Sequence, residues 1–239
     1  MRLSAPVYRL KRKAKLLSRS QNLPLHAALD QVAAAEGFAR WSLLVDSAAA
    51  SPAASLFAAL GPGDLVLLGA RPGQGKTLLS LELAVEAIKA GRTSAFFTLE
   101  YTEVEVLARL RAIGADPVSL ADKFTLDTSD AICADYIIAQ SASAPNGALV
   151  VVDYLQLLDR RRDTPELNVQ IRALRSFARA AGVILVIISQ IDRSYDPAKK
   201  SCPDLSDVRL INELDLGLFS HACFVGSGEI KWSPVSAVA

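Results

Sequence analysis

The stretch from Ala70 to Thr77 constrains this chain more than any other, because it has the spacing of a phosphate-binding loop. Its residues are Ala70, Arg71, Pro72, Gly73, Gln74, Gly75, Lys76 and Thr77. The apolar run 64–69 before it predicts a buried strand, and the apolar spacing over 78–90 predicts a helix. Glycines let the backbone N–H groups of such a loop face a phosphate chain, and the following helix adds a favourable dipole. Although Ala70 replaces the usual first glycine, we expect this loop to bind a nucleoside triphosphate.

The last two residues of the loop have separate expected roles. Lys76 can reach the β- and γ-phosphates, and Thr77 can ligate Mg²⁺. A chance match in a glycine-rich loop is the alternative, and the strand before and helix after the loop argue against it. ATP and Mg²⁺ are therefore the expected cofactors.

Composition is typical of one soluble domain with a small appendage. Of 239 residues, 51% are hydrophobic and 21% charged, which is enough to bury an α/β core. We expect no membrane association, because no apolar run reaches the length of a bilayer span. Three cysteines and two histidines make neither a zinc site nor a disulfide framework, so we expect a reducing, cytoplasmic location. With a net charge of +1, any affinity for nucleic acid must come from local patches.

The N-terminal residues form the clearest such patch. Segment 1–20 contains seven cations and no acidic residue: Arg2, Arg9, Lys11, Arg12, Lys13, Lys15 and Arg19. Helical spacing would place several on one face, where they could contact phosphates. A solvated helix face, or a dock for an acidic protein partner, explains the same pattern. Both interpretations stay open from sequence.

The residues after this patch predict two short helices over 23–44, joined by a turn at Gly37 and Phe38. Phe38 and Trp41 are expected to pack in a core and not to stack on bases. Ser47 to Ser55 is rich in Ala and Ser and contains Pro52, which favours a linker. We therefore predict a basic helical element at 1–50, a linker at 51–59 and a nucleotide-binding domain at 60–239.

Strands and helices alternate after the linker, which predicts an α/β fold with a mostly parallel sheet covered on both faces. Glu100, Asp153 and Gln190 each follow an apolar strand. Ligands of such sheets bind beyond the carboxyl ends of the strands, where the phosphate loop is also expected. We therefore expect these three side chains to lie near the nucleotide.

Each of the three has an expected role and an alternative. Asp153 is expected to hold Mg²⁺ together with Thr77. Glu100 is the candidate general base for the attacking water, or else a cap of the helix that begins near Thr102. Gln190 is expected to hydrogen-bond the γ-phosphate or its water, or else to satisfy backbone groups at the strand end. Lys76, Glu100 and Gln190 are the predicted catalytic residues.

Five motifs in order resemble the ATPase domain of DnaB-type replicative helicases, in the RecA-like group of P-loop NTPases. They are residues 60–64 leading into 70–77, Thr98-Leu99-Glu100, 152–158, 188–193 and 203–209. The resemblance covers roughly Leu60 to Phe224. It implies a RecA-like core that binds ATP and Mg²⁺, with Glu100 catalytic and a loop region between Ile191 and Arg209 that faces DNA. The stretch 191–203 is polar and interrupted by proline, which favours a mobile loop that grips DNA, or else an ordinary surface loop. The expected DNA-contacting residues are Arg193, Lys199, Lys200 and Arg209.

The sequence departs from the family in two ways. Its N-terminal part does not resemble the large helical assembly domain of such helicases. Lys231 is the only cation after Arg209, so no residue matches the family's arginine finger, although 221–225 and 229–232 are predicted to form the preceding hairpin. Leu210-Ile211-Asn212-Glu213 also replaces a small, polar stretch of the family.

Two functions of different class remain from the sequence. The first is a DnaB-like ATPase that hydrolyses ATP and acts with single-stranded DNA, as a helicase or helicase-related factor and as a homo-oligomer. The second is a nucleotide-gated interaction module, with slow or no hydrolysis and no unwinding. The missing finger and assembly domain favour the second, and the complete set of nucleotide motifs favours the first.

Overall fold

Seven strands form one sheet in the order β3-β2-β4-β5-β1-β6-β7 in the computed structural model of the chain, which describes residues 7–21, 23–49, 51–159, 164–210, 212–226 and 229–235. The strands are β1 Leu65–Ala70, β2 Ser94–Thr98, β3 Phe124–Asp127, β4 Leu149–Asp153, β5 Ile184–Gln190, β6 His221–Gly226 and β7 Glu229–Pro234. Neighbouring strands are parallel except β6 and β7, which form the predicted antiparallel hairpin. The predicted mostly parallel α/β fold is confirmed.

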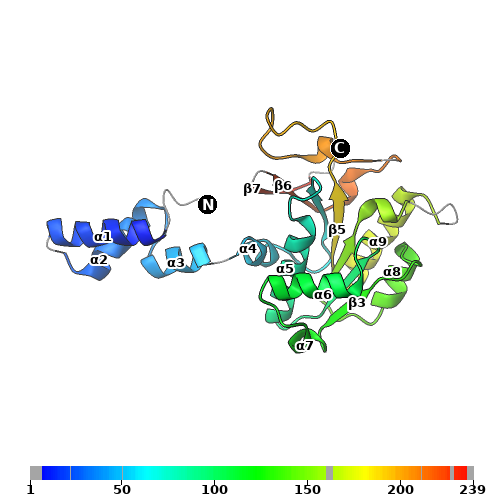
Figure 1. The fold of residues 1–239 in the computed structure, drawn as a ribbon, viewed down its shortest axis with the longest axis horizontal. Coiled ribbons are helices and arrows are strands. Elements are labelled where there is room, and N and C mark those ends of the chain that lie inside the picture. The colour runs from blue at the N-terminus through cyan, green and yellow to red at the C-terminus, as the bar shows by residue number, and fades with distance from the viewer. Residues whose placement is uncertain are drawn as a thin grey trace. The chain divides into compact units, whose positions relative to one another are not determined.

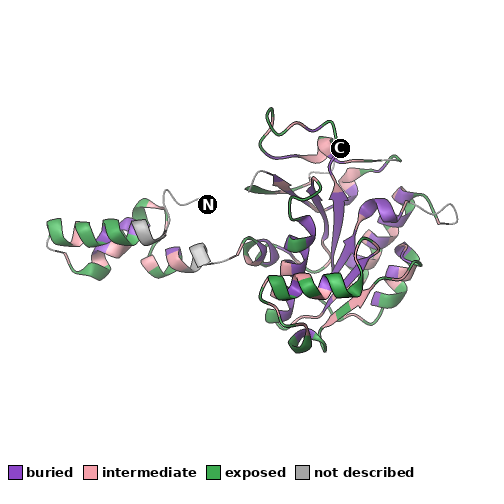
Figure 2. Cartoon of the chain, in the orientation of Figure 1, coloured by how far each residue is buried: buried purple, intermediate pink, exposed green. Residues whose placement is uncertain are grey.

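The central strands are apolar along their whole length because both faces of the sheet are covered. Every residue of β1 and β4 is buried, including the polar Asp153 (Figure 2). Alternate residues such as Leu65 and Leu67 belong to a core cluster with α8 Ala134–Ser141 and α9 Leu167–Ala181. Helix α5, Lys76–Lys89, packs on β1, β2, β4 and β5 (Figure 1). The core is thus a sheet between helices, as the apolar strands predict.

The order of the strands positions the site. β5 lies between β1, which leads into the phosphate loop, and β4, which ends at Asp153. Ala70 is level with Gln190 across the β1–β5 pair, and Asp153 is level with Thr98 across the β4–β2 pair. Because these strands run in the same direction, their carboxyl ends meet at one edge of the sheet.

Local signals explain where several helices begin and end. Helix α6, Glu103–Ala112, begins after Thr102, which forms a capping box with Glu105, as the sequence predicts. Gly182 follows the last residue of α9 and has a φ of 67°, a left-handed conformation that glycine adopts without steric strain because it has no Cβ. The remaining short elements are α4 Pro52–Ala58, α7 Pro117–Leu120, η1 Leu155–Leu157, η2 Leu205–Asp207 and η3 Leu216–Leu218.

Residue contacts divide the chain into two compact units between Ser55 and Leu56. The first contains α1 Val7–Gln21, α2 Leu25–Ala35 and α3 Trp41–Ala49. Phe38 and Trp41 pack against its core, as predicted. Helix α4 lies within the predicted linker 51–59, and the domain boundaries drawn from the sequence stay predictions.

Some of the expectations concern residues outside the described ranges. Arg2 and Ile211 are among these residues, and the side chain of Arg9 is not described either. Within the described ranges, no helix is both long enough and apolar enough to cross a bilayer.

Candidate nucleotide site

The phosphate loop leaves β1 at Ala70 and enters α5 at Lys76, as the sequence predicts. Gly73 and Gly75 have φ angles of 77° and 83°, in the left-handed region that L side chains rarely adopt. A Cβ at either glycine would meet no atom within 4 Å. Backbone conformation, and not crowding, is therefore what requires glycine here.

Thr77 and Asp153 meet at the carboxyl edge of the sheet. The Thr77 hydroxyl donates a hydrogen bond to Asp153 Oδ2 over 3.2 Å. Asp153 is fully buried, and its Oδ1 is a buried oxygen with no hydrogen-bond partner. Burial raises the pKa of Asp153 from 3.8 to about 6; Lys76 opposes this shift and Glu100 adds to it. The site therefore contains a buried carboxylate with one unsatisfied oxygen.

Lys76 and Glu100 form an ion pair beside this carboxylate. Lys76 Nζ lies 3.6 Å from Glu100 Oε2, and the Lys76 side chain is only 7% exposed. The backbone N–H of Glu100 donates to the Thr98 hydroxyl, which fixes the strand end. The alternative role of Glu100 as a helix cap is not what the structure has, because Thr102 and Glu105 cap α6.

The residues fit a Mg²⁺ ion bound together with a substrate. Asp153 Oδ1 lacks a partner, and Thr77 Oγ1 lies beside the same carboxylate. Among the described residues, no group of three or more His, Cys, Asp and Glu side chains could hold a metal. Mg²⁺ is usually held by one or two protein ligands plus waters and substrate phosphates, which matches this donor set.

Gln190 joins the strand edge to the segment that follows it. Its Oε1 accepts a hydrogen bond from Arg209 Nη1 at 3.3 Å, and its backbone carbonyl accepts from the Arg209 N–H at 2.9 Å. Gln156, which follows β4, donates to both Ser189 Oγ and the Arg209 carbonyl. Gln190 and Arg209 are therefore linked, although the sequence places them in separate motifs and predicts a DNA contact for Arg209.

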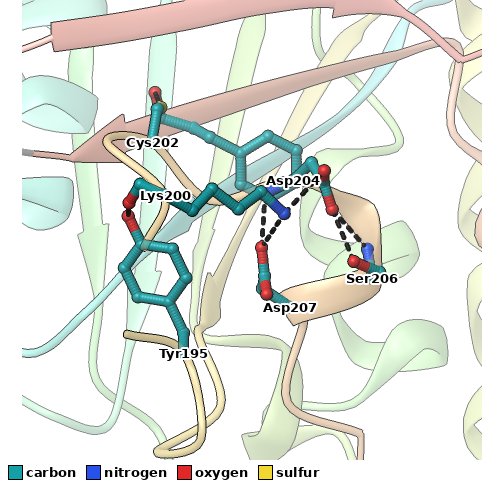
Figure 3. A network of polar contacts seen from close by, with 7 residues as sticks. Tyr195, Lys200, Cys202, Asp204, Ser206 and Asp207 are labelled. Carbon is teal, nitrogen blue, oxygen red and sulfur yellow. Dashed lines mark hydrogen bonds and ion pairs between the residues drawn. The ribbon is translucent and has the colours of Figure 1, made fainter. Parts of the chain in front are cut away.

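The segment 191–209 is tied to itself and to the sheet, whereas the sequence predicts a mobile loop. Ile191 and Val208 form an isolated β-bridge, and the buried Tyr195 donates from its hydroxyl to the Lys200 carbonyl. Lys200 Nζ lies 2.6 Å from Asp204 Oδ2 and 2.5 Å from Asp207 Oδ2 (Figure 3). A buried ring and neutralised charges therefore anchor parts of this segment, and its mobility stays a prediction.

The predicted DNA-contacting cations differ in their surroundings. Arg193 and Lys199 are exposed. Lys200 is half-buried between two carboxylates, which hold the pKa of its ammonium above its ordinary value through hydrogen bonds. Because two carboxylates already neutralise its charge, Lys200 is expected to attract a phosphate less strongly than Arg193 and Lys199.

An open cavity of about 350 Å³ lies against the phosphate loop. Arg71 and Gln74 line it from the loop, and its other walls come from segment 191–209 and the end of β6. Its lining residues are Arg71, Pro72, Gln74, Tyr195, Pro197, Val225 and Gly226. The volume is within the range of pockets that hold small ligands.

Two contacts at the site are missed by sequence reasoning. Arg71 Nη1 contacts the Tyr195 carbonyl at 3.5 Å, which joins the loop to segment 191–209. Arg109 stacks over the Tyr101 ring at 3.9 Å, and its charge also lowers the pKa of Asp153. For the contact between Arg109 and Tyr101, the one available signal is that Arg109 lies on the capped helix that follows Glu100. No local sequence signal predicts the contact between Arg71 and Tyr195.

Comparison with known families agrees with this geometry. The family model described as the DnaB-like helicase C terminal domain matches residues 54–121 and 122–215, more than half of the chain. The chain belongs to this family. Curated DnaB-like relatives include the replicative DNA helicase DnaB of Mycoplasma pneumoniae, 26% identical over 204 residues, and that of Leifsonia xyli subsp. xyli, 29% identical over 184 residues.

These matches involve only part of each relative. They include 66% and 63% of this chain, but only 42% and 40% of the respective DnaB relatives. The chain therefore spans less than half the length of the curated relatives that it matches.

Solved structures share the fold. One of them, described as an ATPase domain, aligns with a TM-score of 0.57 at 20% identity, covering 76% of this chain and 79% of that one. A DnaB-like replicative helicase studied with its primase interactions also aligns at 0.57, with 21% identity, covering 68% of this chain and 47% of that one. The predicted RecA-like core is confirmed.

Proposed function

We propose that this chain is a Mg²⁺-dependent ATPase that acts with single-stranded DNA, as a helicase or helicase-related factor. The observation that carries the proposal is the convergence of four side chains at one sheet edge. Thr77 bonds to the buried Asp153, and Lys76 pairs with Glu100. Membership in the DnaB-like family supports the same class of activity.

The phosphate loop and the adjoining cavity would hold the nucleotide. Backbone N–H groups of the loop and Lys76 would bind the phosphates, with Gly73 and Gly75 permitting the turn. The cavity beside Arg71 and Gln74 would take the base and ribose. Asp153 and Thr77 would hold Mg²⁺, which neutralises charge on the phosphate oxygens when bound.

Glu100 would act as the general base for hydrolysis. It would accept a proton from the water that attacks the γ-phosphorus, while the bond to the β,γ-bridging oxygen breaks and ADP leaves. The Lys76–Glu100 pair supports a simple order of events. When Lys76 turns to the phosphates, the Glu100 carboxylate loses its cation and can receive the proton.

Segment 191–209 would connect hydrolysis with DNA. Gln190 is expected to contact the γ-phosphate or its water, and it already bonds to Arg209. Arg193 and Lys199 are exposed and offer phosphate contacts, with Lys200 and Arg209 as further predicted contacts. A homo-oligomer would bring a neighbouring copy to the edge of the nucleotide site, although no residue of this chain matches the arginine finger of the family.

Steady-state ATP hydrolysis with and without single-stranded DNA, over a range of protein concentrations, tests the proposal. We expect a rate that rises with DNA and rises more than linearly with protein concentration. A slow rate that responds to neither would contradict it and would instead match a nucleotide-gated interaction module. The Lys76→Ala variant is the control for contaminating ATPases.

A further inference from the structure

Helices α1, α2 and α3 form a unit with a core of its own. Its buried residues are Leu10, Ala14, Val32, Ala33 and Leu44. Asp30 Oδ1 accepts a hydrogen bond from the Trp41 N–H at 2.8 Å, which fixes the turn into α3. One face of α1 is therefore committed to packing, and residues on its other face are exposed (Figure 2).

The free face of α1 is basic. Five exposed cations lie on it or at its margins, namely Lys11, Arg12, Lys13, Lys15 and Arg19. Lys11, Lys15 and Arg19 are spaced by four residues, which stacks them in one row of about 12 Å. Within the described part of the chain, none of the five cations forms an ion pair. Like charges at this spacing repel one another and weaken a helix, so an anionic ligand bound along the row would relieve the repulsion.

Charge is divided unequally between the two units. Residues 1–55 contain eight Lys and Arg against three Asp and Glu, whereas residues 56–239 contain eighteen against twenty-two. The chain is nearly neutral as a whole only because these two excesses cancel. The attraction for an anionic polymer is therefore concentrated in the first unit.

The structure argues against two other uses of α1. A helix that lies in a membrane surface inserts its apolar face, but Leu10 and Ala14 are buried in the core of the unit. In a three-helix unit that reads base sequence, the third helix enters the groove, and α3 contains no Lys or Arg that could contact base edges. Contacts with phosphates alone match what α1 offers.

We propose that the basic row on α1 binds the phosphate backbone of a nucleic acid strand, without sequence preference and without ATP. The row belongs to the first unit, whereas the cations of segment 191–209 belong to the second, and binding by the row does not depend on hydrolysis. Its effect would be to hold the chain on DNA while the nucleotide site empties and refills.

Fluorescence anisotropy of the full chain with a labelled single strand of about 30 nucleotides tests this proposal. A duplex of the same length is measured in parallel, in EDTA and without nucleotide, from about 50 to about 300 mM salt. We expect the variant Lys11→Gln/Lys15→Gln/Arg19→Gln to bind at least about tenfold more weakly at low salt. The slope of log affinity against log salt should become shallower by about 2, since three contacts contribute about 0.7 each on a single strand. An equal loss on the duplex would indicate recognition of phosphates in either form.

The matched control removes three exposed cations of the second unit, Arg111→Gln/Lys123→Gln/Arg179→Gln. We expect it to keep its affinity, and an equal loss in this control would overturn the proposal. The variant Lys11→Arg/Lys15→Arg keeps both charges and should bind like the original chain, which separates loss of charge from loss of folding. Unchanged binding by the triple α1 variant would also refute the proposal. Because the assay contains no nucleotide and no free Mg²⁺, its result does not depend on hydrolysis, and failure of the ATPase proposal is distinguishable.

Discussion

Replacing Asp153 with Asn should stabilise the nucleotide-free protein at alkaline pH while abolishing hydrolysis. Asp153 is fully buried at the end of β4, where Thr77 donates a hydrogen bond to Oδ2 and Oδ1 has no partner. Burial raises its pKa because the charged form loses solvation. The amide side chain has nearly the same shape as the carboxylate but no charge, so the folded state would no longer hold a buried anion.

The size of the effect follows from the pKa. The ordinary value of 3.8 and the folded value of about 6 differ by about 2, which is worth about 3 kcal/mol at 1.36 kcal/mol per pH unit. Because the folded pKa is the higher one, the carboxyl group favours folding below pH 3.8, and this contribution is lost as the pH rises through about 6. Relative to the neutral form, the ionised carboxylate therefore destabilises the folded state by the full amount of about 3 kcal/mol at pH 8, and by about half of that amount at pH 5.

Urea denaturation in EDTA at pH 8 and at pH 5 measures this difference. The stability advantage of Asp153→Asn over the original chain should be about 1.5 kcal/mol greater at pH 8 than at pH 5. Any effect of the amide on packing or hydrogen bonding is the same at both pH values and cancels. An advantage that stays constant or grows toward pH 5 would show that Asp153 is not a buried, desolvated carboxylate.

Three further substitutions test other parts of the account. Glu100→Gln should leave binding of a fluorescent ATP analogue nearly unchanged but lower the turnover by about a hundredfold or more, and a rate near the original would assign the base elsewhere. Gly69→Ala would place a Cβ 2.6 Å from the buried Phe224 ring and should lower the free energy of unfolding by about 1–3 kcal/mol in thermal or urea denaturation. The control is Gly61→Ala, whose Cβ meets only Asp64 Oδ2 at 3.8 Å and which should be nearly neutral. Equal losses of stability in the two variants would contradict the packing argument. Lys200→Met should raise the pKa of Asp204, which Lys200 and Ser206 hold at about 2, back toward 3.8 in an NMR titration; an unmoved value would mean that Ser206 alone lowers it.

The sequence predicts the sheet well because buried parallel strands are continuous apolar runs. Leu149 to Asp153 is such a run, and its final acid marks the edge where ligands bind. The phosphate loop is equally local, since its glycines, Lys76 and Thr77 are adjacent in sequence. The sequence therefore suffices to predict which residues follow the strands, and hence which side chains gather.

Contacts between distant segments are harder to predict. Segment 191–209 contains polar residues and prolines, so its composition indicates a free loop. Its anchoring depends on Lys200 meeting Asp204 and Asp207, and on Tyr195 turning inward. Both contacts depend on side-chain rotamers and on the path of the backbone, which the spacing of apolar residues in the sequence does not predict. The bond from Arg209 to Gln190 is hidden for the same reason.

The most direct test of the central claim is the steady-state rate of ATP hydrolysis by the purified chain and by Lys76→Ala, with Mg²⁺ present. Lys76 is nearly buried beside Glu100 at the start of α5, and it is the proposed phosphate-binding cation. We predict measurable turnover by the original chain and a loss to background in the variant. Equal turnover by the two proteins would contradict the assignment of this loop as the site of hydrolysis.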